Sequence, residues 1–188
     1  DGIKGNFLED DIINPLNYYG LSKYEGELEI LKKENSLVFR TNFFGWNIQE
    51  KNSLSEWILD ELRAKNKIYG FKDAYFSSIY TLDFARVIDS AIQKDLSGIF
   101  NCGCTDTYSK FEFAQKIAVK FGFDKLLISP ISIDDFNFKA PRGKILTLDV
   151  HKLERDLDYK LTNISDSINS FYSDYISKLP NKIGKCTK

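Results

Sequence analysis

Apolar and polar positions along the 188-residue chain follow two rhythms. Short, continuous apolar runs are typical of buried strands, and such runs occupy residues 36–40, 67–71, 75–80, 98–102 and 126–133. Apolar residues spaced three and four apart predict helices at 16–33, from 53 onward, and at 83–94, 109–121, 150–157 and 164–179. The segment 41–45 is expected to be a loop after the first strand. Because strands and helices alternate, the pattern predicts an α/β sheet built from strand–helix–strand units.

Two of these helices carry a start signal in the sequence. Ser53 and Ser109 are each followed three residues later by a glutamate, Glu56 and Glu112. A serine in this position can accept a hydrogen bond from the first turn while the glutamate reaches back to the serine amide, which is a capping box. We therefore expect both helices to begin directly after the serine.

Charge and cysteine content narrow the possible functions. The net charge is −1 and lysines interleave with acids, so nothing favours binding to nucleic acid or to an anionic membrane. No apolar run is long enough to span a bilayer, and no signal peptide is visible. Three cysteines are a sparse, odd set that fits a reducing cytoplasm. With a single histidine and no second cysteine pair, we expect no metal site.

One short motif offers chemistry. Tyr19 and Lys23 are four residues apart on a predicted helix, so they share one face and can reach one ligand. A nearby ammonium favours a phenolate, and the pair could therefore exchange a proton with a carbonyl or an alcohol. The spacing alone carries little weight, because a chain with ten tyrosines and this much lysine is expected to contain about one such pair by chance.

Five collinear segments give this pair its context. They are an acidic loop, a proline and Tyr-Gly-Leu-Ser-Lys within 9–27, Arg-Thr-Asn-Phe-Phe-Gly at 40–45, Phe-Ser-Ser-Ile-Tyr-Thr-Leu-Asp-Phe-Ala at 76–85, Gly-Ile-Phe-Asn at 98–101, and Ala-Pro-Arg-Gly-Lys at 140–144 followed by Leu-Asp. Together they resemble the extended short-chain dehydrogenases/reductases that act on nucleotide sugars, most nearly the dTDP-4-dehydrorhamnose reductase group. Tyr80 and Gly143 depart from that group's pattern, which has proline at both positions.

The resemblance implies NADP- or NAD-dependent reduction of a nucleotide-activated 4-keto-6-deoxy sugar, in the synthesis of surface polysaccharide precursors. In this reaction the cofactor supplies the hydride and the protein supplies orientation and a proton. By resemblance, Tyr19 donates the proton to the sugar oxygen and also contacts the cofactor. Lys23 holds the cofactor ribose and assists Tyr19.

Other site residues follow from the same resemblance. Thr41 and Asn42 are expected to border the cofactor's nicotinamide. Phe43 is the candidate for packing against the sugar, with burial in the core as its alternative. Arg142 and Lys144 are expected to meet the diphosphate, for which arginine offers bidentate geometry.

The implied architecture is the C-terminal part of a Rossmann-like, doubly wound parallel sheet with a small α/β substrate-binding lobe. Residues 1–52 and 74–104 would be the remainder of the NAD(P)-binding domain, and residues 53–73 and 105–188 would form the interleaved lobe. The sequence contains no Gly-x-x-Gly-x-x-Gly turn for a dinucleotide and no methionine. We therefore expect a fragment whose cofactor-binding half lies upstream and which is inactive alone.

Two other functions remain open. One is a nucleotide-sugar epimerase or dehydratase of the same fold, because a dehydratase usually carries acids just before the tyrosine-bearing helix, where Glu9, Asp10 and Asp11 stand. The other is a non-catalytic binding subunit resembling the regulatory subunit of methionine adenosyltransferase. For the reductase, the expected partners are a nucleotide-sugar substrate and a second copy of the chain in a homodimer, without nucleic acid or membrane.

Overall fold

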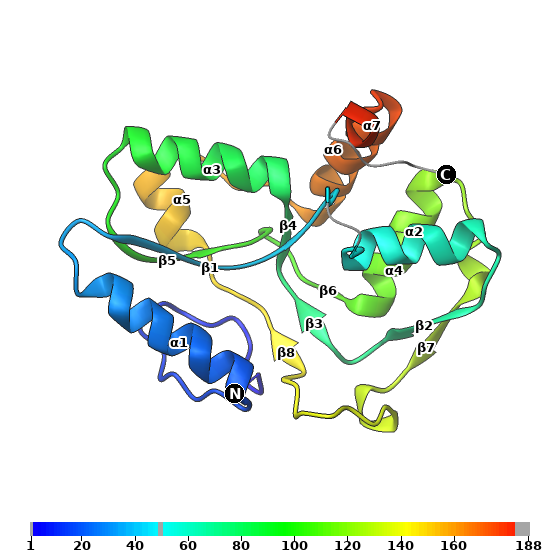
Figure 1. Ribbon diagram of the computed structural model, residues 1–188, viewed down its shortest axis with the longest axis horizontal. Helices are drawn as coiled ribbons and strands as arrows, with labels where there is room; N and C mark the ends of the chain where they lie inside the picture. The colour runs from blue at the N-terminus through cyan, green and yellow to red at the C-terminus, as the bar shows by residue number, and fades with distance from the viewer. Residues whose placement is uncertain (1, 49–50, 183–188) are drawn as a thin grey trace.

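The computed structural model describes residues 2–48 and 51–182, and its central element is the parallel sheet β4-β1-β5 (Figure 1). Strand β1 (Leu37–Phe44) is the longest strand of this sheet. Strand β5 (Gly98–Cys102) pairs with its first five residues, and strand β4 (Ser78–Tyr80) pairs with its last three. The prediction of an α/β fold with a parallel sheet is confirmed.

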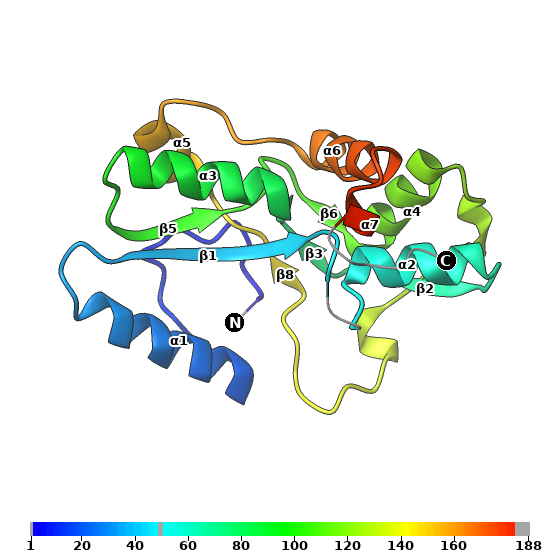
Figure 2. The same ribbon diagram turned by 45° about the horizontal axis from the view of Figure 1, so that its top comes forward.

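Helices cover both sides of this sheet. Helix α3 (Thr81–Gln93) and helix α5 (His151–Leu157) lie on one side of β1 and β5, and helix α1 (Tyr18–Leu31) lies on the other (Figures 1 and 2). Helix α3 begins at the residue after β4 ends, and it buries Val87 and Ala91. In contrast, α1 has no buried residue.

The rest of the chain forms a second layer of elements beside the sheet. Its helices and strands are α2 (Leu54–Arg63), β2 (Ile68–Phe71), β3 (Tyr75–Phe76), β6 (Tyr108–Ser109), α4 (Lys110–Phe121), β7 (Ile128–Ile131), β8 (Ile145–Leu146), α6 (Ile164–Ile176) and α7 (Leu179–Lys182). Strands β2 and β7 pair in parallel, and the short sheet β6-β3-β8 connects them to the large sheet. Within the described ranges, no helix is both long and apolar enough to cross a membrane.

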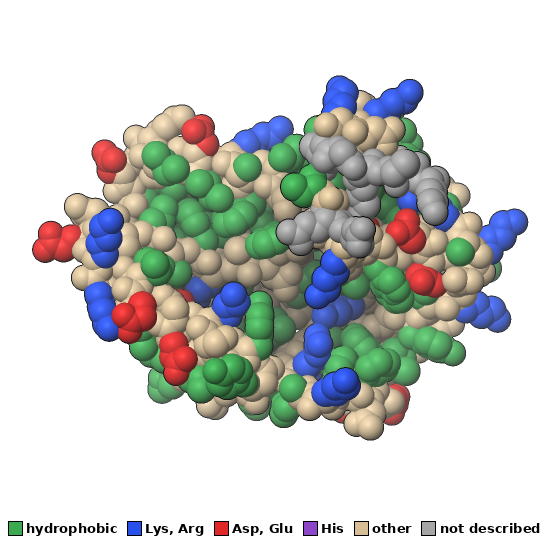
Figure 3. Space-filling model, in the orientation of Figure 1, with side chains coloured by type: hydrophobic (Ala, Val, Ile, Leu, Met, Phe, Trp, Pro, Cys, Tyr) green, Lys and Arg blue, Asp and Glu red, His purple; other side chains and the backbone are tan. Residues whose placement is uncertain are grey.

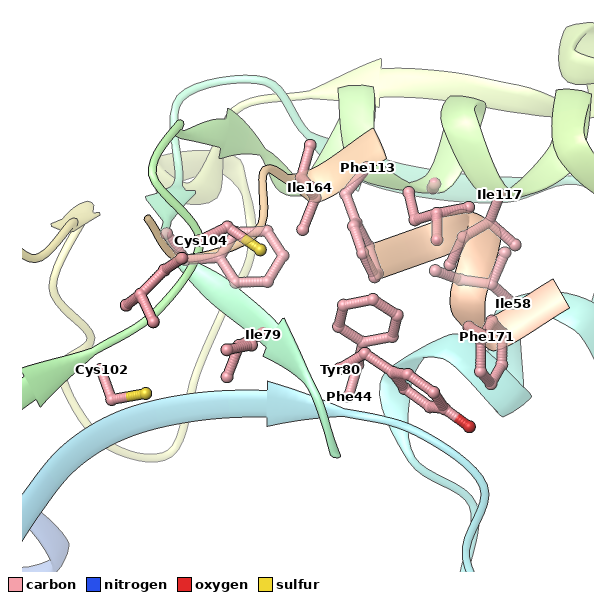
Figure 4. Close-up of a cluster of buried hydrophobic side chains, with 14 of the residues drawn as sticks. Phe44, Ile58, Ile79, Tyr80, Cys102, Cys104, Phe113, Ile117, Ile164 and Phe171 are labelled. Atoms are coloured by element: carbon pink, nitrogen blue, oxygen red, sulfur yellow. The ribbon is translucent and has the colours of Figure 1, made fainter. Parts of the chain in front are cut away.

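An aromatic cluster joins the two parts of the molecule (Figure 4). The ring of Phe44, at the end of β1, lies 5.0 Å from that of Phe113 in α4 and 5.7 Å from that of Phe171 in α6, both edge to face. Tyr80 packs on Phe171 from β4, and its hydroxyl donates a 2.7 Å hydrogen bond to Asp174. Because of this hydrogen bond, the buried Tyr80 ring has no unpaired polar atom. Burial raises the pKa of Tyr80.

The capping boxes are confirmed. The hydroxyl of Ser109 accepts from the amide of Glu112 at 3.1 Å, and the Glu112 carboxylate accepts from the Ser109 amide at 2.8 Å. Ser53 and Glu56 repeat this arrangement at the start of α2. These local bonds need only residues close in sequence, which is why the sequence indicates them.

The predicted loop at 41–45 is wrong for most of its length, because β1 continues to Phe44. The extension is held by β4, whose Ile79 and Tyr80 stand in register with Phe43 and Phe44. This strand end depends on a partner thirty-six residues away in the chain, so the local pattern did not show it.

Other predicted elements divide or shorten. The predicted strand at 75–80 is two strands separated at Ser77, since β3 pairs with β6 and β8 whereas β4 pairs with β1. The predicted strand at 126–133 keeps only residues 128–131, between 3-10 turns at Lys125–Leu127 and Ile133–Asp135. The last predicted helix ends at Ile176, and the separate α7 follows it.

We expect Phe171→Ala to lower the free energy of unfolding by about 3–5 kcal/mol, because the ring is fully buried and the space it leaves cannot collapse. Urea unfolding followed by circular dichroism measures this change. Ile176→Ala, on the exposed end of the same helix, is the matched control and should change stability by less than about 0.5 kcal/mol. Equal effects of both substitutions would contradict the central role of the aromatic cluster.

Candidate functional site

Tyr19 and Lys23 lie on one face of α1, close to its N-terminus. The helix begins after Asn17, whose side-chain oxygen accepts a 2.9 Å hydrogen bond from the Gly20 amide. The Lys23 ammonium lies 5.5 Å from the centre of the Tyr19 ring. The Tyr19 side chain is 71% exposed, so a ligand could reach the phenol and the ammonium from the same side. Such a phenol–ammonium pair can hand over a proton and hold a hydroxyl-bearing group.

Three of the predicted site residues, Thr41, Asn42 and Phe43, lie near the end of β1. Their side chains alternate between the two sides of the sheet. Asn42 is exposed, and alternation along the strand places it on the side of Arg40, which contacts α1. Phe43 lies on the opposite side, where its ring stacks on Phe84 of α3 at 6.1 Å. The Phe43 ring is 56% exposed, which excludes the alternative of plain burial in the core.

Thr41 has an unused hydrogen-bonding group. Its hydroxyl oxygen is buried and has no hydrogen-bond partner within the described part of the chain. A buried polar group without a partner is costly, so its presence at a strand end needs an explanation. Because this oxygen is closed off from the surface, a ligand could become its partner only if neighbouring side chains moved.

The loop that carries Arg142 and Lys144 reaches the start of α1. The Asn17 side-chain amide donates a 2.8 Å hydrogen bond to the carbonyl of Pro141. Arg142 places its guanidinium 4.7 Å from the centre of the Phe138 ring. Lys144 forms an ion pair with Asp134, and the hydrogen bond in this pair raises the pKa of Lys144. The structure therefore brings this loop and the Tyr19 helix together. The Lys144 ammonium is already paired with the Asp134 carboxylate.

Lys110 is a residue of this region that sequence reasoning missed. It directly follows β6, and its amide donates to the Ala74 carbonyl at 3.0 Å, while the neighbouring Tyr75 amide donates to the Lys144 carbonyl at 2.7 Å. The sheet β6-β3-β8 thus aligns Lys110 with the Arg142 loop. Burial lowers the pKa of Lys110, and the charge of Arg142 lowers it further.

A signal for Lys110 was present in the sequence. The residue stands at the first position of α4, where the helix dipole disfavours a cation. In the space-filling view, Lys and Arg side chains gather along the middle of the face between α1 and α2 (Figure 3). A cation held against the helix dipole is suited to meeting an anion.

The cysteines and two aspartates have structural surroundings. Burial raises the pKa of Cys102 and of Cys104 to about 12, so both are neutral thiols at ordinary pH. Asp149 accepts from the His151 amide at 2.9 Å, at the start of α5. Asp83 is buried and accepts from the Ser167 hydroxyl at 2.9 Å.

Potential metal ligands do not form a cluster in the described part of the chain. No three His, Cys, Asp or Glu side chains within residues 2–48 and 51–182 gather closely enough to hold a metal ion. Cys186 lies outside the described residues.

We expect Lys110 to titrate below the ordinary pKa of a lysine, and we expect Arg142→Met to raise its pKa while leaving it below that ordinary value, because burial remains the larger cause. Nuclear magnetic resonance of carbon-13 methylated lysines measures the titration. Arg155→Met removes an exposed guanidinium that pairs with Asp156 and serves as the matched control. An unchanged Lys110 titration in Arg142→Met would show that the two charges do not interact.

Several known proteins are similar to this chain. A dTDP-4-dehydrorhamnose reductase from Bacillus anthracis, whose structure was solved in complex with NADP, superposes with a TM-score of 0.79 at 24% identity, over 88% of this chain and 58% of that one. This likeness shows a shared Rossmann-like fold.

Sequence relatives fall into two groups. The methionine adenosyltransferase 2 subunit beta of Danio rerio is 29% identical over 163 residues, which cover 82% of this chain and 50% of the relative. The dTDP-4-dehydrorhamnose reductase of Aggregatibacter actinomycetemcomitans is 27% identical over 169 residues, which cover 82% and 56%. The chain thus spans about half the length of these curated relatives. A family model for the RmlD substrate binding domain matches residues 1–177, and the chain therefore belongs to that family.

Proposed function

We propose that this chain supplies the proton-donating and sugar-binding part of an NAD(P)H-dependent reductase of a nucleotide-activated 4-keto-6-deoxy sugar. The observation that carries the proposal is the exposed Tyr19–Lys23 pair on α1, next to the loop that presents Arg142. Relatives that are dTDP-4-dehydrorhamnose reductases support the reaction, and the NADP complex of a reductase with this fold supports the cofactor.

Tyr19 is the proposed proton donor to the oxygen of the reduced carbonyl. Reduction also requires a hydride, which the nicotinamide cofactor supplies when bound. Lys23 has two tasks, since its ammonium stabilises the phenolate left by proton transfer and can hydrogen-bond the cofactor's ribose. The attraction between an ammonium and an exposed aromatic ring is only about 0.5–1 kcal/mol. We therefore expect the interaction between Lys23 and Tyr19 to strengthen when bound ligands exclude water from the pair.

Thr41 and Asn42 are the proposed contacts to the nicotinamide part of the cofactor. The exposed Asn42 side chain fits this role, because it offers hydrogen-bonding capacity at the end of β1. The Thr41 hydroxyl has no partner among the described residues, but it is buried and alternation places it on the α3 side. Asn42 lies on the side of the sheet that α1 covers, as Tyr19 and Lys23 require.

The proposed substrate contacts are Phe43 for the sugar and Arg142 with Lys144 for the diphosphate. The Phe43 ring is open to a ligand, but it stacks on Phe84 of α3, on the side of β1 away from Tyr19, so its role rests on the resemblance. Arg142 pairs with no acid within the described residues, whereas Lys144 must first give up Asp134. Lys110, beside Arg142, is a further candidate for the diphosphate.

We also propose which segments of the chain belong to each of two domains. Residues 1–52 and 74–104 belong to the nucleotide-binding part, and residues 53–73 and 105–188 form the substrate lobe, although residues 1, 49–50 and 183–188 lie outside the described ranges. A cytoplasmic homodimer working in surface polysaccharide precursor synthesis is the corresponding biological proposal.

Two of the three acids before α1, Glu9 and Asp11, make structural contacts, which disfavours their use in a dehydratase, whereas Asp10 is exposed. Glu9 accepts from the Asn101 amide at 2.8 Å, and Asp11 accepts from the Leu8 amide and forms an ion pair with Lys4. The likeness to the methionine adenosyltransferase subunits is the basis of the non-catalytic alternative, which is no better supported than the reductase. Oxidation of NADPH by a dTDP-4-keto-6-deoxy sugar distinguishes the reductase from the non-catalytic subunit, since a binding subunit does not oxidise the cofactor.

In the full-length protein, Tyr19→Phe should lower kcat by about a hundredfold or more, because the proton donor is lost while the ring and Lys23 remain. The fall in nicotinamide absorbance with a dTDP-4-keto-6-deoxy sugar measures the rate. Tyr18→Phe, which alters an exposed neighbour on the same helix, should keep the parent rate. Full turnover in Tyr19→Phe would contradict the assignment of the proton donor.

A further inference from the structure

Helix α1, the longest helix at 14 residues, is attached to the molecule differently from α2 and α4. None of its residues is buried, whereas α2 and α4 each bury an apolar face. In both ribbon views it lies alone on its side of β1 (Figures 1 and 2). Apolar packing therefore does little to fix how this helix is turned about its own axis. Because the helix carries Tyr19 and Lys23, its rotation decides where those two side chains point.

A bidentate ion pair connects the far part of α1 to the centre of β1. The Arg40 guanidinium donates from Nε to one oxygen of Glu27 at 2.9 Å and from Nη2 to the other at 2.6 Å. The side chains of Arg40 and Glu27 are only 20% and 10% exposed. The pairing raises the pKa of Arg40, mainly through these hydrogen bonds. A planar fork on a carboxylate fixes direction as well as distance.

Arg40 is itself held by a second set of contacts. Its Nη1 donates to the carbonyl of Glu9 at 2.8 Å. The carboxylate of Glu9 in turn accepts from the amide of Asn101 in β5, whose side-chain amide donates to the Phe7 carbonyl at 2.7 Å. The guanidinium thus lies where α1, the segment before it and two adjacent strands meet. A side chain held by three hydrogen bonds to two partners can act as a rigid point of attachment.

The spacing along α1 links this attachment to the proposed site. Tyr19, Lys23 and Glu27 follow one another at intervals of four, which places them along one side of the helix. A rise of about 1.5 Å per residue puts Tyr19 about 12 Å along the axis from Glu27. Holding Glu27 therefore fixes both the rotation of the helix and the face on which Tyr19 and Lys23 stand.

We propose that Arg40 is a positioning residue, which orients Tyr19 and Lys23 through Glu27 without touching substrate or cofactor. The part that concerns the reaction rests on the proposed function; the attachment of α1 does not. Lysine in place of Arg40 would keep the charge but has a single ammonium, which cannot reproduce the fork to Glu27 and the bond to Glu9 together.

Hydrogen exchange of this chain, read by mass spectrometry, tests the attachment. In Arg40→Lys and in Glu27→Gln, amides of residues 18–31 should exchange about tenfold faster, while those of residues 110–121 stay within about twofold of the parent. Arg63→Lys alters an arginine that pairs with Asp60 on α2 and is the matched control. Unchanged exchange of α1, or equal acceleration of α1 and α4, would overturn the proposal.

Kinetics of the full-length protein test the positioning. Arg40→Lys should lower kcat at least about tenfold and leave the KM for the nucleotide sugar near its parent value, because Phe43, Arg142 and Lys144 do not lie on α1. Parent kcat in Arg40→Lys, combined with an inactive Tyr19→Phe, would overturn positioning and leave the proposed function intact. Full turnover in both variants would contradict the proposed function itself, and the exchange of α1 would then decide the attachment alone.

Discussion

The pairing of β1 with two successive partners is the constraint on which the rest of the structure depends. The first five residues of β1 pair with β5 and the last three pair with β4, so one strand aligns segments that lie far apart in the chain. The second pairing carries Phe44 to the place where Tyr80 and Phe171 meet. Buried aromatic rings in edge-to-face contact then hold the sheet and the α2–α4–α6 layer together.

The two faces of β1 are stabilised by different physics. On the α3 side, Phe39 and Phe43 contact Phe84, and burial of apolar surface is the stabilising term. On the α1 side, Arg40 and Glu27 make a partly buried, bidentate ion pair. Such a pair adds little net stability compared with apolar packing, but it fixes geometry. A helix that must present a phenol and an ammonium at a set angle is well served by that kind of contact.

Local signals explain which parts of the fold could be predicted. The capping boxes at Ser53 and Ser109 were correct because their partners lie three residues away. The end of β1 was missed because its hydrogen bonds go to β4. Lys110 was missed for a similar reason, since only the β6-β3-β8 sheet reveals its neighbour Arg142. A lysine at the first position of a helix was the one available hint.

The sequence by itself determined the alternation of strands and helices, the starts of α2 and α4, and the shared face of Tyr19 and Lys23, because periodicity and capping are set by neighbours in the chain. The tertiary structure alone decided how that face is oriented. It joins α1 to β1 through Glu27 and Arg40, and it joins the Arg142 loop to α1 through Asn17. It also pairs Lys144 with Asp134, and it leaves Arg142 without an acidic partner among the described residues. Such contacts link residues distant in sequence, so they exist only once the chain has folded.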